Sequence, residues 1–273
     1  MIKNYNYKPV KYFCAVFIFT WIFWIAAIFF SRSGTDNETS IVLMLLGLLV
    51  PSITTLITVF LSKNAELKND LKKKATDISR VKPLNILFAI ALMGIIIVAS
   101  ILLSLLLGQS LAQLSFADGF SFKVGGISTL LTIILAASLE EMGWRGYAQD
   151  AIASRCSWFK ATIIFGCVWA LWHLPLFFIE TTYQYEILQM NPWYMVNFFA
   201  GIPPMAILFT WVYLKNSRSI FACMFFHFIV NFLQEKIAMT QITKCVETIV
   251  IYITAIVIIL TCKKMFFDKS HLD

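Results

Sequence analysis

Ser128-Thr-Leu-Leu-Thr-Ile-Ile-Leu-Ala-Ala-Ser-Leu-Glu-Glu-Met-Gly-Trp-Arg145 is a membrane-like stretch that ends in two acids and an arginine. Only 16 uncharged residues, 124–139, precede Glu140, and this is fewer than the roughly 20 that cross a bilayer. A spanning helix here must therefore carry Glu140 and Glu141 into the membrane. Because a carboxylate in hydrocarbon is costly unless it is paired or hydrated, such acids usually face a cavity and take part in chemistry or transport.

The composition of the whole chain is that of a membrane protein. Of its 273 residues 59% are hydrophobic and 14% are charged, and the mean hydropathy is +0.78, which is too apolar for a soluble domain of this length. We therefore expect an all-α polytopic integral membrane protein, a single helical bundle over 1–273 with a motif-bearing core at about 124–234. Apolar windows of about 20 residues predict eight transmembrane helices, near 11–30, 41–62, 84–107, 124–147, 161–180, 193–214, 217–234 and 246–262.

The net charge of +7 follows from the positions of the basic residues relative to these spans. Of the 22 lysines and arginines, 18 lie in the two tails, in 63–83, in 145–160 and just after 214, all on one predicted side. By the positive-inside rule both termini are cytoplasmic in a cell-membrane protein. The charge is thus a topology signal, and nucleic acid is not an expected partner. We expect 63–83 to be a solvated connector, with an interfacial helix as the alternative.

The two acids of the fourth span are predicted to have different roles. Glu141 and Arg145 are four residues apart and share a helix face, so an ion pair is expected between them. Glu140 points about 100° away from that face. Glu141 and Arg145 are therefore predicted to support the structure, and Glu140 is left free to act.

Two of the three histidines lie in apolar spans. His173 is in the fifth, and His227 is in the seventh with Asn231 one turn further on the same face. At 1.5 Å per residue, His173 lies about 18 Å, His227 about 15 Å and Glu140 about 10 Å from the cytoplasmic ends of their helices. Allowing for tilt, the three side chains can meet, and we expect them to line a polar cavity that faces the cytosol.

An acid, two imidazoles and a carboxamide suit hydrolysis. Glu140 can take a proton from water, His173 can orient that water, and His227 with Asn231 can donate hydrogen bonds to an oxyanion. Two histidines and a glutamate are also the ligands of several zinc peptidases. The sequence has no HExxH motif, and its ligands would come from three helices, so spacing alone leaves both mechanisms open.

Three motifs on successive polar helices resemble a known family. They are Glu140-Glu-x-x-x-Arg145, an aromatic residue four positions before a histidine (Trp169 to His173), and His227-x-x-x-Asn231. Together they are similar to the CPBP/ABI superfamily of intramembrane proteases, and within it to the Ras-converting CAAX endopeptidases of methanogenic archaea. Trp169 departs from the family pattern, which usually has Phe there.

The resemblance implies an endopeptidase that removes the last three residues of a prenylated CAAX tail. It implies that Glu140 and His173 activate water, that His227 and Asn231 stabilise the oxyanion, and that no metal or other cofactor is needed, with zinc as the alternative. The expected partners are prenylated CAAX peptides or proteins and membrane lipids.

Other functions stay open at this stage. Cys223 and His227 share a face, which would suit a cysteine protease, but the six cysteines contain no CxxC pair and membrane cysteines are usually inert. A proton-coupled transporter or a non-enzymatic binding protein could use the same polar residues. Four aromatic residues are candidates for a prenyl-binding groove, although lipid-facing positions are the preferred interpretation: Phe177, Phe178, Phe198 and Phe199.

Overall fold

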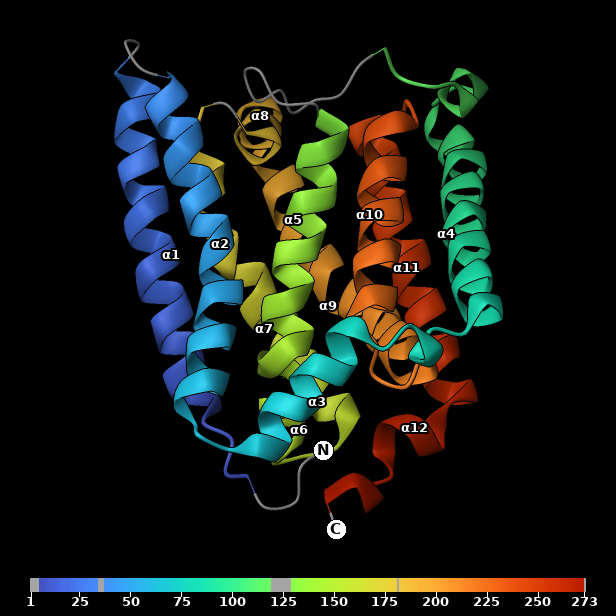
Figure 1. The fold of residues 1–273 in the computed structure, drawn as a ribbon. Helices are drawn as coiled ribbons and strands as arrows, with labels where there is room; N and C mark the ends of the chain where they lie inside the picture. Colours follow the sequence, from blue (N-terminus) through green and yellow to red (C-terminus); the bar gives the residue numbers. More distant parts are fainter. Residues whose placement is uncertain (1–4, 34–36, 119–128, 181, 273) are drawn as a thin grey trace.

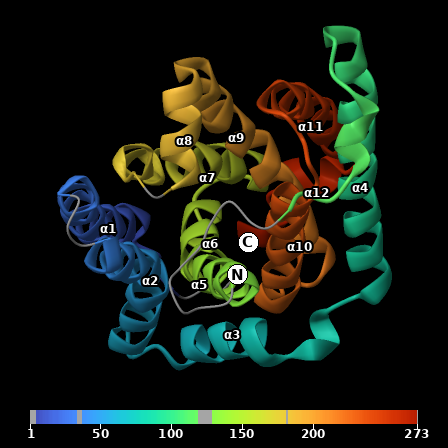
Figure 2. The same cartoon turned by 90° about the horizontal axis from the view of Figure 1, so that it is seen from above.

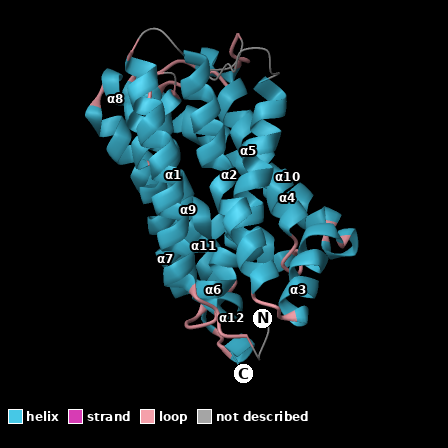
Figure 3. Ribbon diagram, turned by 60° about the vertical axis from the view of Figure 1, so that its left-hand side comes forward, coloured by secondary structure: helices cyan, strands magenta, loops and turns pink. Residues whose placement is uncertain are grey.

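The computed structural model describes residues 5–33, 37–118, 129–180 and 182–272, and these form a bundle of helices (Figures 1 and 3). Within this part there is no strand, and only an isolated antiparallel bridge joins Phe116 to Ile237. The first residues of the predicted fourth span, 124–128, lie outside the described residues. The α-helices are α1 Pro9–Arg32, α2 Asn37–Leu61, α3 Ala65–Thr76, α4 Pro83–Ser104, α5 Thr129–Gly143, α6 Gln149–Ala153, α7 Trp158–Trp172, α8 Tyr183–Met190, α9 Pro192–Lys215, α10 Ile220–Lys236, α11 Gln241–Thr261 and α12 Lys263–Phe267.

Six of the described helices are long and apolar enough to cross a membrane, so the predicted number of eight is not confirmed. The six correspond to α1, α2, α4, α7 with the turn that follows it, α9 and α11. The two remaining predicted spans are α5 and α10, which have 15 and 17 residues. Both run alongside the long helices in the middle of the bundle (Figures 1 and 2). For α5 this is the length of the described part, which begins at Thr129. The acids and polar residues of both helices are what an interior position between other helices allows.

Local sequence signals explain where several helices begin. Proline is the first residue of α1, α4 and α9, where its missing N–H is not needed. The side chains of Ser157 and Ser219 accept hydrogen bonds from the first turns of α7 and α10. These caps fix the starts of the two helices that carry His173 and His227.

Glycines opposite prolines bring the helices of the core close together. A Cβ added to Gly143 of α5 would lie 2.4 Å from the Cβ of Pro51 in α2, and one added to Gly166 of α7 would lie 2.8 Å from the Cα of Pro203 in α9. These prolines lie inside α2 and α9, and each stands opposite a glycine of a neighbouring helix.

The segment 63–83 is not a solvated connector, because it contains the helix α3, which crosses the bundle near the end where α6 and α12 lie (Figure 1). Leu67 and Leu71 are buried there, and the side chain of Lys74 is only 1% exposed. Its Nζ donates hydrogen bonds to the carbonyls of Arg145 and Gly146 and to Asp150. The expectation was wrong because Lys74 finds these partners on a distant part of the chain.

Candidate active site

The helix that carries the two acids changes its winding directly after them. α5 ends at Gly143, a π-helical turn covers Trp144–Ala148, and α6 follows. Turns of this kind occur frequently at functional sites. Every residue of the π-turn is buried. Both glutamates are also buried, with Glu140 7% exposed and Glu141 fully covered.

Glu141 and Arg145 form the predicted ion pair. The Nη1 of Arg145 lies 3.0 Å from both carboxylate oxygens of Glu141. The guanidinium group also lies over the rings of Phe165, Trp169 and Phe209, at 4.9, 5.6 and 4.9 Å from their centroids. Its Nε and Nη2 have no acceptor among the described residues, so aromatic faces take the place of further hydrogen bonds.

Glu140 is held by two tryptophans. Its Oε2 accepts hydrogen bonds from the indole N–H groups of Trp169, at 2.9 Å, and Trp144, at 3.2 Å. One tryptophan lies on α7 and the other in the π-turn. Hydrogen-bond donors from two different segments, α7 and the π-turn, therefore fix the orientation of the Glu140 carboxylate.

His173 ends α7, directly before a short 3-10 turn, Leu174–Phe178, that contains Pro175. A proline disfavours helical geometry for the residue before it, and Pro175 therefore explains why α7 ends next to His173. The Nδ1 of His173 lies 2.8 Å from the carbonyl oxygen of Trp169. Because a carbonyl only accepts, Nδ1 is the donor, and a neutral ring then carries its lone pair on Nε2.

His227 has a partner that the sequence did not indicate. Its Nδ1 lies 2.9 Å from Oε1 of Glu141, although the two residues are 86 positions apart. Glu141 therefore joins Arg145 and His227 in one buried cluster. The ring of Trp169 meets both His173 and His227, with centroids 6.0 and 5.8 Å apart.

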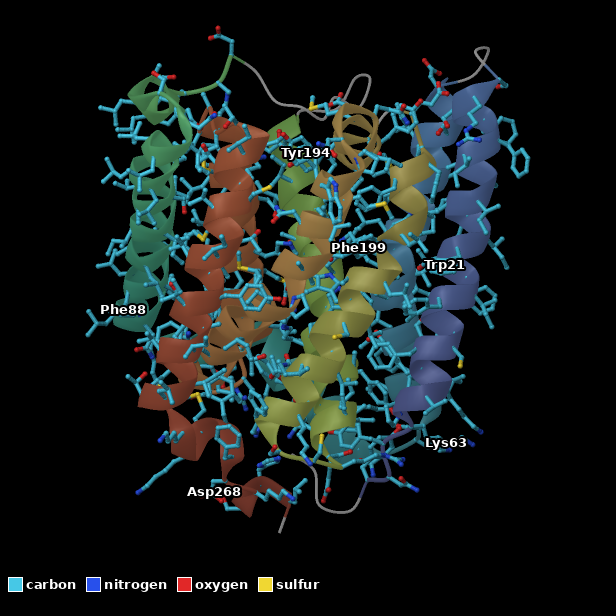
Figure 4. The ribbon with its side chains drawn as sticks, turned by 180° about the vertical axis from the view of Figure 1, so that it is seen from behind. Trp21, Lys63, Phe88, Tyr194, Phe199 and Asp268 are labelled. Atoms are coloured by element: carbon cyan, nitrogen blue, oxygen red, sulfur yellow. The ribbon has the colours of Figure 1, made fainter. Side chains whose placement is uncertain are left out.

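A cavity of about 410 Å³ brings the four candidate catalytic residues together. Glu140, His173, His227 and Asn231 all line it. Asn231 is half-buried on α10, and its side-chain amide makes no hydrogen bond to the described residues. The lining continues through α8 and the adjoining parts of α9 and α11. One lining residue, Tyr194, lies at the end of the bundle opposite to Lys63 and Asp268 (Figure 4).

The cavity therefore extends away from the chain termini, which lie at the other end (Figure 1). No described residue of α3, α6 or α12 contributes to its wall. The expectation of a cytosol-facing cavity together with cytoplasmic termini is not confirmed, because the two features lie at opposite ends of the molecule. Counting residues along single helices predicts how deep each side chain lies in the membrane. It does not predict toward which end of the bundle the cavity extends.

Further polar residues of the cavity wall were missed by the sequence analysis. They come mainly from α8, α10 and α11: Tyr183, Gln234, Glu235, Gln241, Lys244 and Glu247. The signal was present in the last span, where positions 241, 244 and 247/248 are polar at helical spacing. The predicted span began only at residue 246, so it did not include positions 241 and 244, which belong to α11.

The structure divides the four aromatic candidates for a prenyl groove. Phe177 is fully buried and Phe178 is 38% exposed. Phe198 lines the cavity and packs against His173, with ring centroids 5.5 Å apart. The lipid-facing interpretation is therefore wrong for Phe177 and Phe198. Cys223 is buried and is absent from the cavity wall.

The described residues contain His, Cys, Asp and Glu side chains of the kinds that bind metals. None of their His, Cys, Asp and Glu side chains form a group of three that could hold a metal ion. The hydrogen-bonded Nδ1 atoms of both histidines would suit ligands through Nε2, but a set of at least three ligands is needed for zinc.

Comparison with known proteins agrees with the resemblance of the motifs. Residues 124–233 match the family described as type II CAAX prenyl endopeptidase Rce1-like. The chain is also 44% identical over 269 residues to CAAX prenyl protease 2 of Methanococcus maripaludis, an alignment that covers 98% of this chain and 99% of that protein. The protein is thus a membrane-embedded hydrolase of the CAAX endopeptidase class. It belongs to the Rce1-like family of type II CAAX prenyl endopeptidases.

Proposed function

We propose that this protein hydrolyses the peptide bond after a prenylated cysteine and releases the C-terminal tripeptide of a CAAX protein or peptide. The observation that carries the proposal is the convergence of Glu140, His173, His227 and Asn231 on one cavity among transmembrane helices. The name of the relative from Methanococcus maripaludis supports the same substrate class.

Glu140 and His173 activate the attacking water. The two indole donors hold the Glu140 carboxylate in place, and its other oxygen accepts a proton from the water. His173 directs Nε2 away from the helix that binds its Nδ1 and orients the same water. The hydroxide adds to the carbonyl carbon of the prenylated cysteine, and the proton passes to the amine of the leaving tripeptide as the carbon–nitrogen bond breaks.

His227 and Asn231 receive the oxyanion of the tetrahedral intermediate. The Asn231 amide has its N–H donors uncommitted toward the described residues. His227 uses Nδ1 for Glu141, so it donates to the oxyanion through Nε2 when both ring nitrogens carry hydrogen. Glu141 then faces two cations, Arg145 and the imidazolium. No step is assigned to a metal, because the described side chains do not provide a ligand set.

The orientation in the cell membrane is the finer part of the proposal. Of the 22 basic residues, 18 lie in segments that the sequence predicts on one side of the membrane, and this supports cytoplasmic termini. The cavity then extends toward the outer face. A CAAX tail anchored in the inner leaflet must in that case reach Glu140 from within the bilayer, drawn by its prenyl chain, with membrane lipids as its neighbours.

The reaction can be tested with purified protein and a farnesylated CAAX peptide. We expect mass spectrometry to find the intact C-terminal tripeptide and a prenylcysteine with a free carboxyl group, and no cleavage of the same peptide without its prenyl group. Cleavage should survive exhaustive metal removal. A stoichiometric zinc that is lost together with activity would overturn the metal-free mechanism, and the absence of cleavage would overturn the proposed function.

A further inference from the structure

Among the described residues that line the cavity, the only lysine or arginine is Lys244 of α11. Its Nζ donates hydrogen bonds to the hydroxyl of Tyr183, at 3.3 Å, and to the carbonyl of Gln234, at 3.5 Å. It also lies 4.6 Å from the centroid of the Tyr183 ring. No described carboxylate lies within ion-pair distance of it. An ammonium group has three N–H donors, so one remains available to an anion in the cavity.

Neither of two neighbouring polar groups, the Tyr183 hydroxyl and the Glu247 carboxylate, accepts a hydrogen bond from the third N–H of Lys244. The hydroxyl of Tyr183 donates to Gln241, at 3.0 Å, and is therefore the acceptor for Lys244. The buried carboxylate of Glu247 accepts from the side chain of Gln234, at 2.6 Å. Glu235 and Glu247 also line this wall, and Glu247 interacts with Lys244 through its charge, so the remaining N–H donor of Lys244 is the feature of this wall that suits an anion.

The separation between Lys244 and the candidate catalytic residues can be measured along α10. From His227 to Gln234 the helix rises seven residues, or about 10 Å. Because Nζ contacts the Gln234 carbonyl, it stands about one such length along the cavity from His227. An extended peptide advances about 3.3–3.6 Å per residue, so three residues cover the same distance.

We propose that Lys244 binds the free C-terminal carboxylate of the substrate and so sets the cleavage position at three residues from the end. This inference rests on the proposed function of the same site. A peptide whose scissile carbonyl lies between Glu140 and Asn231 reaches Lys244 with its terminal carboxylate when exactly one tripeptide follows the bond. The ligand class is an α-carboxylate at the end of an apolar tripeptide.

The test compares two farnesylated peptides that differ only at the C-terminus, one a free acid and one an amide. Wild-type protein should cleave the acid with a kcat/KM about 10–100-fold above that of the amide, the usual effect of one hydrogen bond between charged groups. Lys244→Met should bring the ratio near one, mainly through a higher KM for the acid. Lys244→Arg should restore most of the preference.

Lys236→Met is the matched control. Lys236 ends α10 near the same end of the bundle but does not line the cavity, so this variant should keep the wild-type ratio. The ratio is internal to each protein, so partial loss of folding does not change it. Equal cleavage of acid and amide by wild-type protein would overturn the role of Lys244. Failure to cleave either peptide would instead overturn the proposed function.

Discussion

Trp169 connects three of the groups that define the candidate site. Its indole N–H binds Glu140, its carbonyl accepts from His173, and its ring meets the edge of His227. The resemblance treated this position as one aromatic residue in place of another. The structure shows a difference, because phenylalanine would keep the ring contacts and remove the hydrogen bond to Glu140.

Trp169→Phe should therefore lower kcat while leaving the fold intact. Loss of one hydrogen bond to a charged group costs about 1.5 kcal/mol, or about tenfold in rate. KM should change little, since the lost contact positions Glu140 and does not bind substrate. The measurement is steady-state cleavage of a farnesylated peptide. Trp211→Phe, a buried tryptophan outside the cavity wall, is the control, and an equal loss in both variants would contradict the positioning role.

Much of the site could be located from single residues, and the remainder depends on contacts between distant segments. Glu140, His173, His227 and Asn231 stand out because each is polar in an apolar span, and the Glu141–Arg145 pair follows from helical spacing. The bond between Glu141 and His227 links residues 86 positions apart, and no local pattern contains it. Lys244 was overlooked because the predicted last span began at residue 246, which left this lysine among the basic residues outside the spans.

At the scale of elements, the end of the bundle nearest the termini is held by a buried ion cluster. Asp150 of α6 binds Lys74 of α3, at 2.7 Å, and Arg218, which precedes α10. Asp70 pairs with the same two cations. The hydroxyl of Tyr213 donates to Asp150, at 3.1 Å. The cluster thereby fastens α3 to the helices that carry the candidate site.

Asp150→Asn should destabilise the protein. Removing one charge from a buried pair typically costs about 3–5 kcal/mol, which corresponds to a melting temperature lower by about 10 °C. Thermal unfolding in detergent measures the effect. Asp77→Asn removes a more exposed carboxylate that pairs with Arg80, and it should have little effect. Equal melting temperatures for Asp150→Asn and wild type would show that the cluster does not stabilise the fold.

The same comparison should depend on pH. Burial raises the pKa of Asp150, but Arg218 and Lys74 outweigh it and hold the pKa well below its usual range. A carboxyl group with a depressed folded pKa stabilises the fold above its unfolded pKa, about 3.9, and loses that contribution as the pH falls toward the folded value. The difference between wild type and Asp150→Asn should therefore be complete at pH 7 and shrink below about pH 4.

The apolar windows predicted the positions of the long helices along the sequence better than their local geometry and their contacts. Six long spans follow from composition and length. The π-turn at Trp144–Ala148 has no counterpart in the hydrophobic pattern, because its position reflects packing around Arg145. The helix α3 was only the alternative prediction for 63–83, because its many charges favoured a solvated connector. In the structure Lys74 is instead buried and donates to backbone carbonyls of the π-turn.

At the scale of the whole molecule, the basic residues and the cavity favour opposite orientations of the protein in the membrane if its substrate comes from the cytosol. The basic end of the bundle carries the termini and α3, and the cavity extends toward α8 (Figures 1 and 4). Composition predicted the first feature, but only the folded chain reveals the second.

Labelling of single cysteines in intact cells decides between the two orientations. In a background without native cysteines that still cleaves peptide, Met190→Cys of α8 should react with a membrane-impermeant maleimide, and Lys72→Cys of α3 should react only after the cells are opened. Both positions are exposed. Labelling of Lys72→Cys alone from outside would reverse the orientation and give a cytosolic tail direct access to the cavity.

The most direct measurement of the central claim is the turnover number of Glu140→Gln on a farnesylated CAAX peptide. Glutamine keeps the shape of the side chain and an acceptor for the two indoles, and it removes only the basic oxygen. We predict a fall in kcat of about 10²–10⁴-fold, with an unchanged melting temperature. Glu235→Gln, which neutralises another acid of the same cavity, should retain activity. A Glu140→Gln protein that releases the tripeptide at the wild-type rate would contradict the account.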